Sequence, residues 1–509
     1  MHNLKPFIVV FVLACLYLWL AKPIFTRFID PRDYVRRRNV WLLLTVAAFL
    51  LPSFWIYVLL AAPVLFVAGR RDSNPIGVYA ATVFVIPPLS LAIPVLGINQ
   101  LFDLTQHRLL ALTVLLPAAF HIISRRTTDR AAALTTMDWA LLAYGALQVV
   151  LLVPYESVTN TMRRAFLFGL DTLIVFYVVS RIGPNRRQLV DTLATFVWIC
   201  GLWSAIALFE TFKGWLLYEG INQVWGAPNV GAFLLRGNSL RSQVSAGHSL
   251  NFGYLMALGF SYWLYLRQQV PQSKIGWSVL VWVSAGLIAS YSRAPWLAAV
   301  ICIFVFLALH PGGASAFFKG AGGLFLVVGV AFVSGIGSDF FDRLPFIGTI
   351  DQENVEYRQR LAETSWTLIQ QNPYFGNPFA VLQMESLRQG SGGIIDLVNA
   401  YANIALFYGL VTLAVFAAFA LLVVTKGLRA TRRLRGIDND LALLGGTLVG
   451  ALIASLFFIA TALLETSTFV VAALVGSFIR LAAARLQAQA SPAPAPMFGA
   501  PLRPFASQK

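Results

Sequence analysis

Residues 40–69 read VWLLLTVAAFLLPSFWIYVLLAAPVLFVAG and contain no charged side chain. This run is too long for one untilted membrane helix of about 20 residues. Pro52 and Ser53 interrupt it in the middle, where a turn would be favoured. The stretch therefore predicts two transmembrane helices joined by a short turn, and similar apolar stretches recur along the chain.

The composition of the whole chain also indicates a membrane protein. Of 509 residues, 58% are hydrophobic and 12% are charged, and the mean hydropathy is +0.72. A soluble domain carries about 25% charged residues, so the bilayer must act as solvent. We expect an all-α polytopic membrane protein with about 12–15 transmembrane helices. Besides the pair above, the expected spans lie near 6–26, 76–98, 108–124, 136–153, 164–180, 188–210, 246–266, 275–290, 296–309, 321–338, 397–424, 441–460 and 466–481.

The net charge of +16 reflects topology more than a partner such as nucleic acid. Lys and Arg gather in alternate connections, which the positive-inside rule assigns to the cytoplasm. Residues 1–486 should form one membrane-integral domain, and the Ala- and Pro-rich residues 487–509 a disordered cytoplasmic tail. The cytoplasmic connections would be 27–39, 69–75, 125–130, 181–187, 267–274, 310–320, 426–440 and 480–509.

Cysteine and acidic residues give little sign of chemistry inside the spans. Cys15, Cys200 and Cys302 lie in apolar stretches and indicate packing, not a disulfide framework or a metal site. Asp171 and Asp191 are the main intramembrane acids; each could act directly or simply lie in a helix interface beside a hydroxyl group. We expect neither a metal nor a cofactor.

Two long outer loops, about 211–245 and 339–396, point to chemistry at the opposite face. The first ends in LRGNSLRSQVSAGHSLNFG, residues 235–253. Arg236 and Arg241 offer planar forks to phosphate oxygens, although either could be an ordinary interfacial arginine. His248 stands where a helix enters the membrane, as a ligand or as a packing residue.

A third arginine lies in a tight outer turn, in the stretch Ser292-Arg293-Ala294-Pro295-Trp296. Pro295 suits the first turn of a helix and Trp296 the membrane interface. Arg293 would be a further phosphate ligand, or an interfacial arginine.

The second long loop contains a predicted helix over 353–371, ended by Asn372-Pro373 and with Tyr357, Leu361 and Leu368 on one stripe. Arg360 has Glu356 and Glu363 at ion-pairing distance along the helix, whereas Arg358 has no local acid. Arg358 is thus the better candidate to face a ligand.

The same loop closes with glycines at 392–393 and Asp396. Asp396 could be a general base towards a sugar hydroxyl, or an acid at a helix N-terminus.

Three elements in order resemble the O-antigen ligase and Wzy-type O-antigen polymerase superfamily, over about 236–410. Arg241 and His248 with Leu-Asn-Phe-Gly resemble its Arg–Gly–His–Pro region, although Ser249 replaces a common Pro. The turn at 292–296 resembles its Ser-Arg-Gly-Ala-Trp turn. Arg358 followed by Pro373 and Gly376 resembles its Arg…Asn-Pro-x-x-Gly segment.

One departure distinguishes two activities within the superfamily. Ligases commonly carry His-Asn before the span that follows the long loop, and here the pair is Val398-Asn399. Residues Asp396 to Tyr401 resemble instead the Asp-x-Val-Asn-x-Tyr pattern of exopolysaccharide polymerases. The resemblance favours a polymerase with Asp396 as base, and adds Asn399 and Tyr401 to the substrate-binding candidates.

The resemblance implies a metal-independent glycosyltransferase of the bacterial inner membrane with a periplasmic active face. Its donor would be an undecaprenyl-pyrophosphate-linked oligosaccharide and its acceptor a second lipid-linked repeat unit. Arg358 and Arg293 would be catalytic with Asp396, and Arg241, His248, Arg236 and Arg360 would bind substrate. A chain-length regulator and a flippase would be partners in the bilayer. Transfer of finished glycan to another acceptor by a ligase, and a polysaccharide transporter or flippase, remain alternatives.

Overall fold

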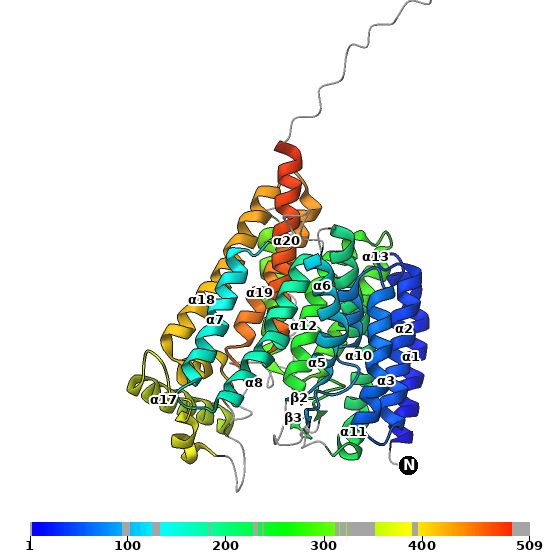
Figure 1. The fold of residues 1–509 in the computed structure, drawn as a ribbon. Coiled ribbons are helices and arrows are strands. Elements are labelled where there is room, and N and C mark those ends of the chain that lie inside the picture. The colour runs from blue at the N-terminus through cyan, green and yellow to red at the C-terminus, as the bar shows by residue number, and fades with distance from the viewer. Residues whose placement is uncertain are drawn as a thin grey trace, which may run out of the picture.

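A computed structural model describes residues 3–93, 102–124, 133–182, 185–226, 233–236, 239–310, 352–388 and 397–490, with isolated positions besides. Figure 1 shows a bundle of long helices that run side by side, with α11, β2, β3 and α17 gathered at one end. We name this end the loop end. The opposite end, where α20 leaves the bundle, is named the basic end, because Arg186, Arg187 and Arg485 form ion pairs there.

The described elements are almost entirely helical. The first half of the chain forms α1 (Leu4–Phe25), α2 (Pro31–Leu50), α3 (Phe54–Arg71), α4 (Pro75–Thr82), α5 (Gln106–Leu110), the π-helical η1 (Ala111–Leu115), α6 (Leu116–Ser124), α7 (Thr136–Leu152), α8 (Val158–Phe168), the π-helical η3 (Gly169–Leu173), α9 (Ile174–Ile182) and α10 (Arg186–Lys213). The second half forms α11 (Glu219–Val224), α12 (Ser249–Leu266), the 3-10 helix η4 (Arg267–Gln269), α13 (Ser273–Ala289), α14 (Arg293–Leu309), α17 (Gln352–Gln371), the 3-10 helix η5 (Ala380–Leu387), α18 (Ala400–Leu434), α19 (Asn439–Phe458) and α20 (Thr466–Ala490). Two antiparallel hairpins join β1 (Leu91–Ala92) to β2 (Asp103–Leu104) and β3 (Leu235–Arg236) to β4 (Ser239–Leu240).

The all-α polytopic class is confirmed. Among the described residues, seven helices are long and apolar enough to cross a membrane. They are Leu4–Phe25, Phe54–Arg71, Gln106–Ser124, Arg186–Lys213, Ala400–Leu434, Asn439–Phe458 and Thr466–Gln489. Three shorter apolar helices, α7, α13 and α14, pack against α18, α10 and α19. The expected span at 321–338 and the start of the second long loop lie outside the described residues.

The thirty-residue apolar run folds as the predicted hairpin. Helix α2 ends at Leu50 and α3 begins at Phe54, with the Ser53 hydroxyl accepting a hydrogen bond from the Trp55 amide. The preceding basic segment is helical rather than a loop. Asp30 caps α2 and Pro31 occupies its first turn, so the helix begins well before the apolar run.

The prediction of one span over 76–98 is wrong. Helix α4 ends at Thr82, and the chain then continues as irregular backbone to the β1–β2 hairpin. Pro87 and Pro88 explain the difference, because proline has no amide hydrogen and cannot continue a helical ladder. Phe84, Ile86 and Pro88 are therefore available to line a cavity between helices.

Near the basic end, buried ion pairs join helices that are distant in sequence. Arg37 is fully buried and binds both oxygens of Asp72, with contacts down to 2.6 Å, and both oxygens of Asp191 at 2.9 Å. Asn74 also donates to Asp191. Asp191 thus lies in a helix interface, but the partners of its carboxylate are Arg37 and Asn74 and not a hydroxyl group. A buried pair of this kind fixes how α2, α3 and α10 meet.

The C-terminal helix is longer than expected. Helix α20 continues to Ala490, past the predicted start of the tail at 487, and residues 491–509 lie outside the described part of the chain.

Candidate functional site: an arginine-lined turn and helix α17

Three of the predicted arginines meet at the turn between α13 and α14. The hairpin β3–β4 lies against this turn, because the Ser242 amide donates to Ala289 O at 3.1 Å. Arg236 Nη1 donates to Tyr291 O, and Arg241 Nη2 donates to Ser292 Oγ, both at 2.9 Å. Arg293 begins α14 directly after these residues. We name Ser290–Arg293 with Arg236 and Arg241 the arginine turn.

The backbone of the arginine turn adopts an uncommon conformation. Tyr291 has φ of 45°, in the left-handed region that side chains other than glycine rarely occupy. Ser292 Oγ donates to Ser290 O at 3.0 Å, and the Ser290 hydroxyl accepts from the Ser292 amide at 3.3 Å. Trp296 Nε1 donates to Leu287 O at 3.1 Å and closes the turn from the α14 side. Such a fixed, strained turn is typical of a site that must hold side chains in place.

A buried glutamate holds the chain that leads into Arg241. Glu210 is fully buried near the end of α10. Its Oε2 accepts hydrogen bonds from Ser242 Oγ at 2.6 Å and from the Val244 amide at 3.0 Å, and its Oε1 accepts from the Leu217 amide at 3.1 Å. Glu210 therefore ties both ends of the first long loop to one carboxylate. Glu210 was not among the residues predicted from the sequence; a lone acid at the end of an apolar span was the available signal.

His248 begins α12 as its N-cap. Its Nδ1 accepts a hydrogen bond from the Leu250 amide at 3.1 Å, and its side chain is exposed. Nδ1 is therefore occupied by the helix start, while the ring faces outward at the loop end.

Helix α17 lies at the loop end and packs on the start of α18, as Figure 1 shows. The predicted helix 353–371 is confirmed, as Gln352–Gln371. Leu361 and Ile369 are buried on its inner face, and Tyr357 and Leu368 pack beside them. The predicted stripe is thus confirmed.

The two arginines of α17 have different surroundings. Arg360 Nη2 lies 3.4 Å from Glu356 Oε2, with both side chains exposed, so the expected ion pair is present. Glu363 is engaged by Gln359 Nε2 at 3.0 Å. Arg358 lines a cavity of about 110 Å³ whose wall also contains Asn399 and Thr461.

Asn399 and Tyr401 hold the start of α18. Asn399 Oδ1 accepts from the amides of Tyr401 at 3.0 Å and Ala402 at 3.1 Å and so caps the helix. The Tyr401 hydroxyl donates to Leu456 O at 2.7 Å. Both side chains thus have structural partners beside the cavity of Arg358. Asp396, the predicted base, lies outside the described residues.

The segment Asn372–Gly376 docks against a break in α18. Gly409 inside α18 has φ of 80°, and the amides of Leu410 and Val411 donate to Pro373 O at 2.8 Å and Tyr374 O at 3.3 Å. Gly376 also has a positive φ, and a Cβ there would lie 2.6 Å from the Gly409 nitrogen. The Asn-Pro-x-x-Gly pattern therefore fixes α17 to the first turns of α18.

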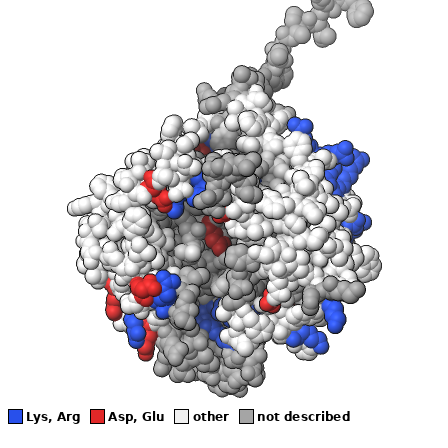
Figure 2. Space-filling view, turned by 60° about the horizontal axis from the view of Figure 1, so that its bottom comes forward, with Lys and Arg blue, Asp and Glu red and all other residues white. Residues whose placement is uncertain are grey.

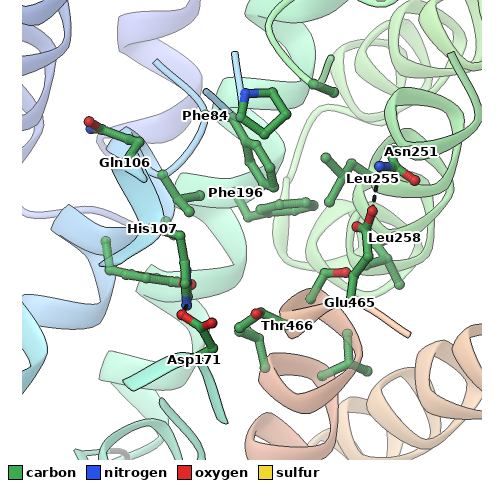
Figure 3. Close-up of a pocket in the computed structure, with 18 of the residues that line it drawn as sticks. Phe84, Gln106, His107, Asp171, Phe196, Asn251, Leu255, Leu258, Glu465 and Thr466 are labelled. Carbon is green, nitrogen blue, oxygen red and sulfur yellow. Dashed lines mark hydrogen bonds and ion pairs between the residues drawn. The ribbon is translucent and has the colours of Figure 1, made fainter. Parts of the chain in front are cut away.

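A larger cavity of about 360 Å³ is lined mainly by α4, α5, η3, α10, α12 and α20, and Figure 3 shows part of its lining. We name it the large cavity. Asp171 is in its wall, bound by Arg108 Nη2 at 2.8 Å, and Glu465 stands across from it. His107, Arg108 and Glu465 were not predicted as site residues. Their partners are remote in sequence, so no local pattern could reveal them.

Fold and site together define a multi-pass membrane protein that presents arginines at one end. Residues 278–417 match the family model described as O-antigen ligase, a range that contains Arg293, Arg358, Asn399 and Tyr401. The resemblance to the O-antigen ligase and polymerase superfamily is thereby confirmed, and the match supports a polysaccharide-related ligase or polymerase role. A comparison with curated proteins gave no match.

Proposed function

We propose that the protein polymerises a lipid-linked oligosaccharide at the periplasmic face of the inner membrane. The observation that carries the proposal is the convergence of Arg236, Arg241 and Arg293 on one rigid turn. Guanidinium groups held at fixed positions suit a pyrophosphate, whose negative charge grows as it leaves.

In this reaction the hydroxyl oxygen of the acceptor sugar attacks the anomeric carbon of the donor glycan. The bond from that carbon to the pyrophosphate oxygen breaks, and undecaprenyl pyrophosphate leaves with the electron pair. Asp396 takes the proton of the attacking hydroxyl. The arginines stabilise the leaving charge without requiring a metal ion. Arg358, on α17 beside the start of α18, is assigned to the same anionic donor.

Val398 supports polymerase over ligase, because ligases of the superfamily commonly have histidine at the corresponding position. The alternative function, a ligase, is supported by the description of the matching family as O-antigen ligase. The two differ in product: a polymerase gives a ladder of repeats from one lipid-linked substrate, and a ligase gives one transfer to a different acceptor.

The experiment incubates the purified protein with undecaprenyl-pyrophosphate-linked repeat units, with and without excess EDTA. We expect a ladder of lipid-linked polymer under both conditions. A ladder that disappears with EDTA and returns with magnesium would contradict metal independence. Transfer to a lipid acceptor in place of a ladder would support the ligase.

A further inference from the structure

The large cavity has an apolar body and a polar rim. Its body contains aromatic and aliphatic side chains from α4, the irregular segment after it, α10, α12 and α20, among them Phe84, Phe196, Tyr262 and Leu474. Phe196 and Tyr262 pack edge to face with centroids 5.7 Å apart. A volume of about 360 Å³ is near the lower end of the range for small-ligand sites.

The polar rim has two walls. On one side Asp171 accepts from Arg108 Nε at 3.0 Å and Nη2 at 2.8 Å, and His107 Nε2 lies 3.9 Å from the same carboxylate. On the other side Glu465 accepts a hydrogen bond from Asn251 Nδ2. Figure 3 shows these two groups facing each other across the cavity, with Thr466 between them.

The charges of the rim do not favour binding of a pyrophosphate. Within the described wall the formal charges belong to Arg108, Asp171 and Glu465. Arg108 is already engaged, since its Nη1 also donates to Asp103 O at 2.6 Å. Glu465 offers no positive charge to an anion and repels one when ionised, whereas the arginine turn offers cations. In Figure 2 acidic side chains lie in a hollow near the middle of this face, and both acidic and basic side chains lie around it.

The rim suits an uncharged, hydroxyl-rich ligand. Carboxylate and amide oxygens accept hydrogen bonds, while amide, hydroxyl and imidazole groups donate them. Burial raises the pKa of Glu465 to about 7, so near neutral pH its carboxyl is present in both forms and can donate or accept. Aromatic side chains below the rim offer flat faces to the C–H surface of a sugar ring.

The cavity lies close to both parts of the candidate site. Asn251 is two residues before Gly253, where a Cβ would lie 2.7 Å from Ser290 Oγ and 2.8 Å from Pro295 Cγ at the arginine turn. Glu465 ends the connection from α19 to α20, in which Thr461 lines the cavity of Arg358. The large cavity is thus linked to the arginine turn through α12, and to the cavity of Arg358 through the connection from α19 to α20.

Helix geometry also sets this cavity apart. Asp171 lies in η3, a five-residue π-helical segment between α8 and α9, and the second π-helical segment, η1, follows His107 and Arg108. Such segments are rare and often occur at functional sites. They replace the regular helical spacing on the wall that carries the ion pair.

We propose that this cavity binds the terminal sugar of the acceptor, with Glu465, Asn251 and Asp171 hydrogen-bonded to its hydroxyl groups. The proposal rests on the proposed glycosyl transfer. It assigns the uncharged acceptor glycan to the large cavity and the anionic donor pyrophosphate to the arginines.

The test uses a phosphate-free acceptor, the repeat-unit oligosaccharide on a short alkyl aglycone, with the undecaprenyl-pyrophosphate-linked donor. Glu465→Gln should raise KM for this acceptor roughly tenfold, because the amide replaces one hydrogen-bond-accepting oxygen by a donor, and leave KM for the donor unchanged. Glu385→Gln is the matched control, because Glu385 is an exposed acid on η5 and pairs with Arg388. A raised donor KM with a normal acceptor KM would overturn the assignment.

A second variant fills the cavity. Thr466→Trp should abolish binding of the phosphate-free glycoside to the protein in lipid nanodiscs, measured by isothermal titration calorimetry. Leu463→Trp is its control, since Leu463 is 49% exposed and lies three residues earlier. Normal binding by Thr466→Trp would overturn the proposal and leave the cavity to a lipid chain.

This binding measurement needs no turnover. If wild-type protein binds the glycoside but transfers nothing, the proposed function fails and the sugar site stands. If it polymerises but Thr466→Trp and Glu465→Gln behave as wild type in both assays, the sugar site fails and the function stands.

Discussion

Arg358 and Arg360 lie two positions apart on α17, and on a helix their side chains point roughly 200° apart. Arg358 lines the cavity beside Asn399, whereas Arg360 is paired with Glu356 in solvent. Arg358→Ala should lower turnover about a hundredfold, near 3 kcal/mol, as for loss of a group that stabilises the transition state. Arg358→Lys should also impair turnover, because the ammonium group keeps the charge but loses the planar fork.

Arg360→Ala is the control for that change, and it should cost well under about 1 kcal/mol, the value of an exposed ion pair. The length of the polymer ladder is compared at equal amounts of membrane protein. Normal polymer from Arg358→Ala together with none from Arg360→Ala would show that the opposite face of α17 meets the substrate.

Glu210 provides a second residue-scale prediction. It accepts hydrogen bonds from Leu217 near the start of the first long loop and from Ser242 and Val244 near its end. Since Ser242 directly follows Arg241, Glu210 holds the backbone beside Arg241 in place. Glu210→Gln replaces one acceptor oxygen by a donor and leaves buried donors unsatisfied, at a cost of about 1–3 kcal/mol. We expect a lower midpoint of thermal unfolding and a shorter polymer ladder.

The control is Glu219→Gln in the same loop, where the exposed side chain accepts only from Gln223 at 3.4 Å among its described contacts. If Glu210→Gln unfolds and polymerises as Glu219→Gln does, then Glu210 does not position Arg241.

At the scale of elements, the join between α17 and α18 depends on two glycines. A Cβ on Gly409 would lie 2.0 Å from Tyr374 O, and one on Gly376 would lie 2.6 Å from the Gly409 nitrogen. Both residues have positive φ. Gly376→Ala and Gly409→Ala should each combine a backbone clash with a conformational cost of about 1–2 kcal/mol. We expect each to lower the unfolding midpoint strongly and to reduce polymerisation.

Gly436→Ala separates these two costs. Gly436 has φ of 80°, but no neighbouring atom lies within 4 Å of a Cβ built there. This variant should show only the conformational part of the loss. Equal midpoints for Gly436→Ala and Gly376→Ala would mean that the contact between the two segments adds nothing to stability.

The same elements show how far the sequence could predict the structure. Hydropathy located the hairpin at 40–69, and periodicity with Asn372-Pro373 located α17, because both signals are local. The span predicted at 76–98 was wrong, because hydropathy counts Pro87 and Pro88 within an apolar stretch although prolines cannot continue the hydrogen bonds of a helix. The pairing of Asn251 with Glu465, 214 positions apart, carries no local signal. The arginines of the turn were predicted as candidates, but their common location depended on how β3–β4 docks.

At the scale of the whole molecule, the proposed function depends on which end faces the periplasm. The basic end carries ion pairs of Arg186, Arg187 and Arg485, whereas the arginine turn and α17 lie toward the loop end. Positive charge in short connections favours retention in the cytoplasm, so we expect the loop end to be periplasmic.

Labelling of single cysteines checks this in a Cys15→Ser background, because Cys200 and Cys302 are buried. Leu382 on η5 is 72% exposed and Ile437, before α19, is 40% exposed. An impermeant maleimide should label Leu382→Cys in spheroplasts with an intact inner membrane, and Ile437→Cys only after that membrane is disrupted. The reverse pattern would place the arginine turn in the cytoplasm, out of reach of a donor presented in the periplasmic leaflet, and the polymerase proposal would fail with it.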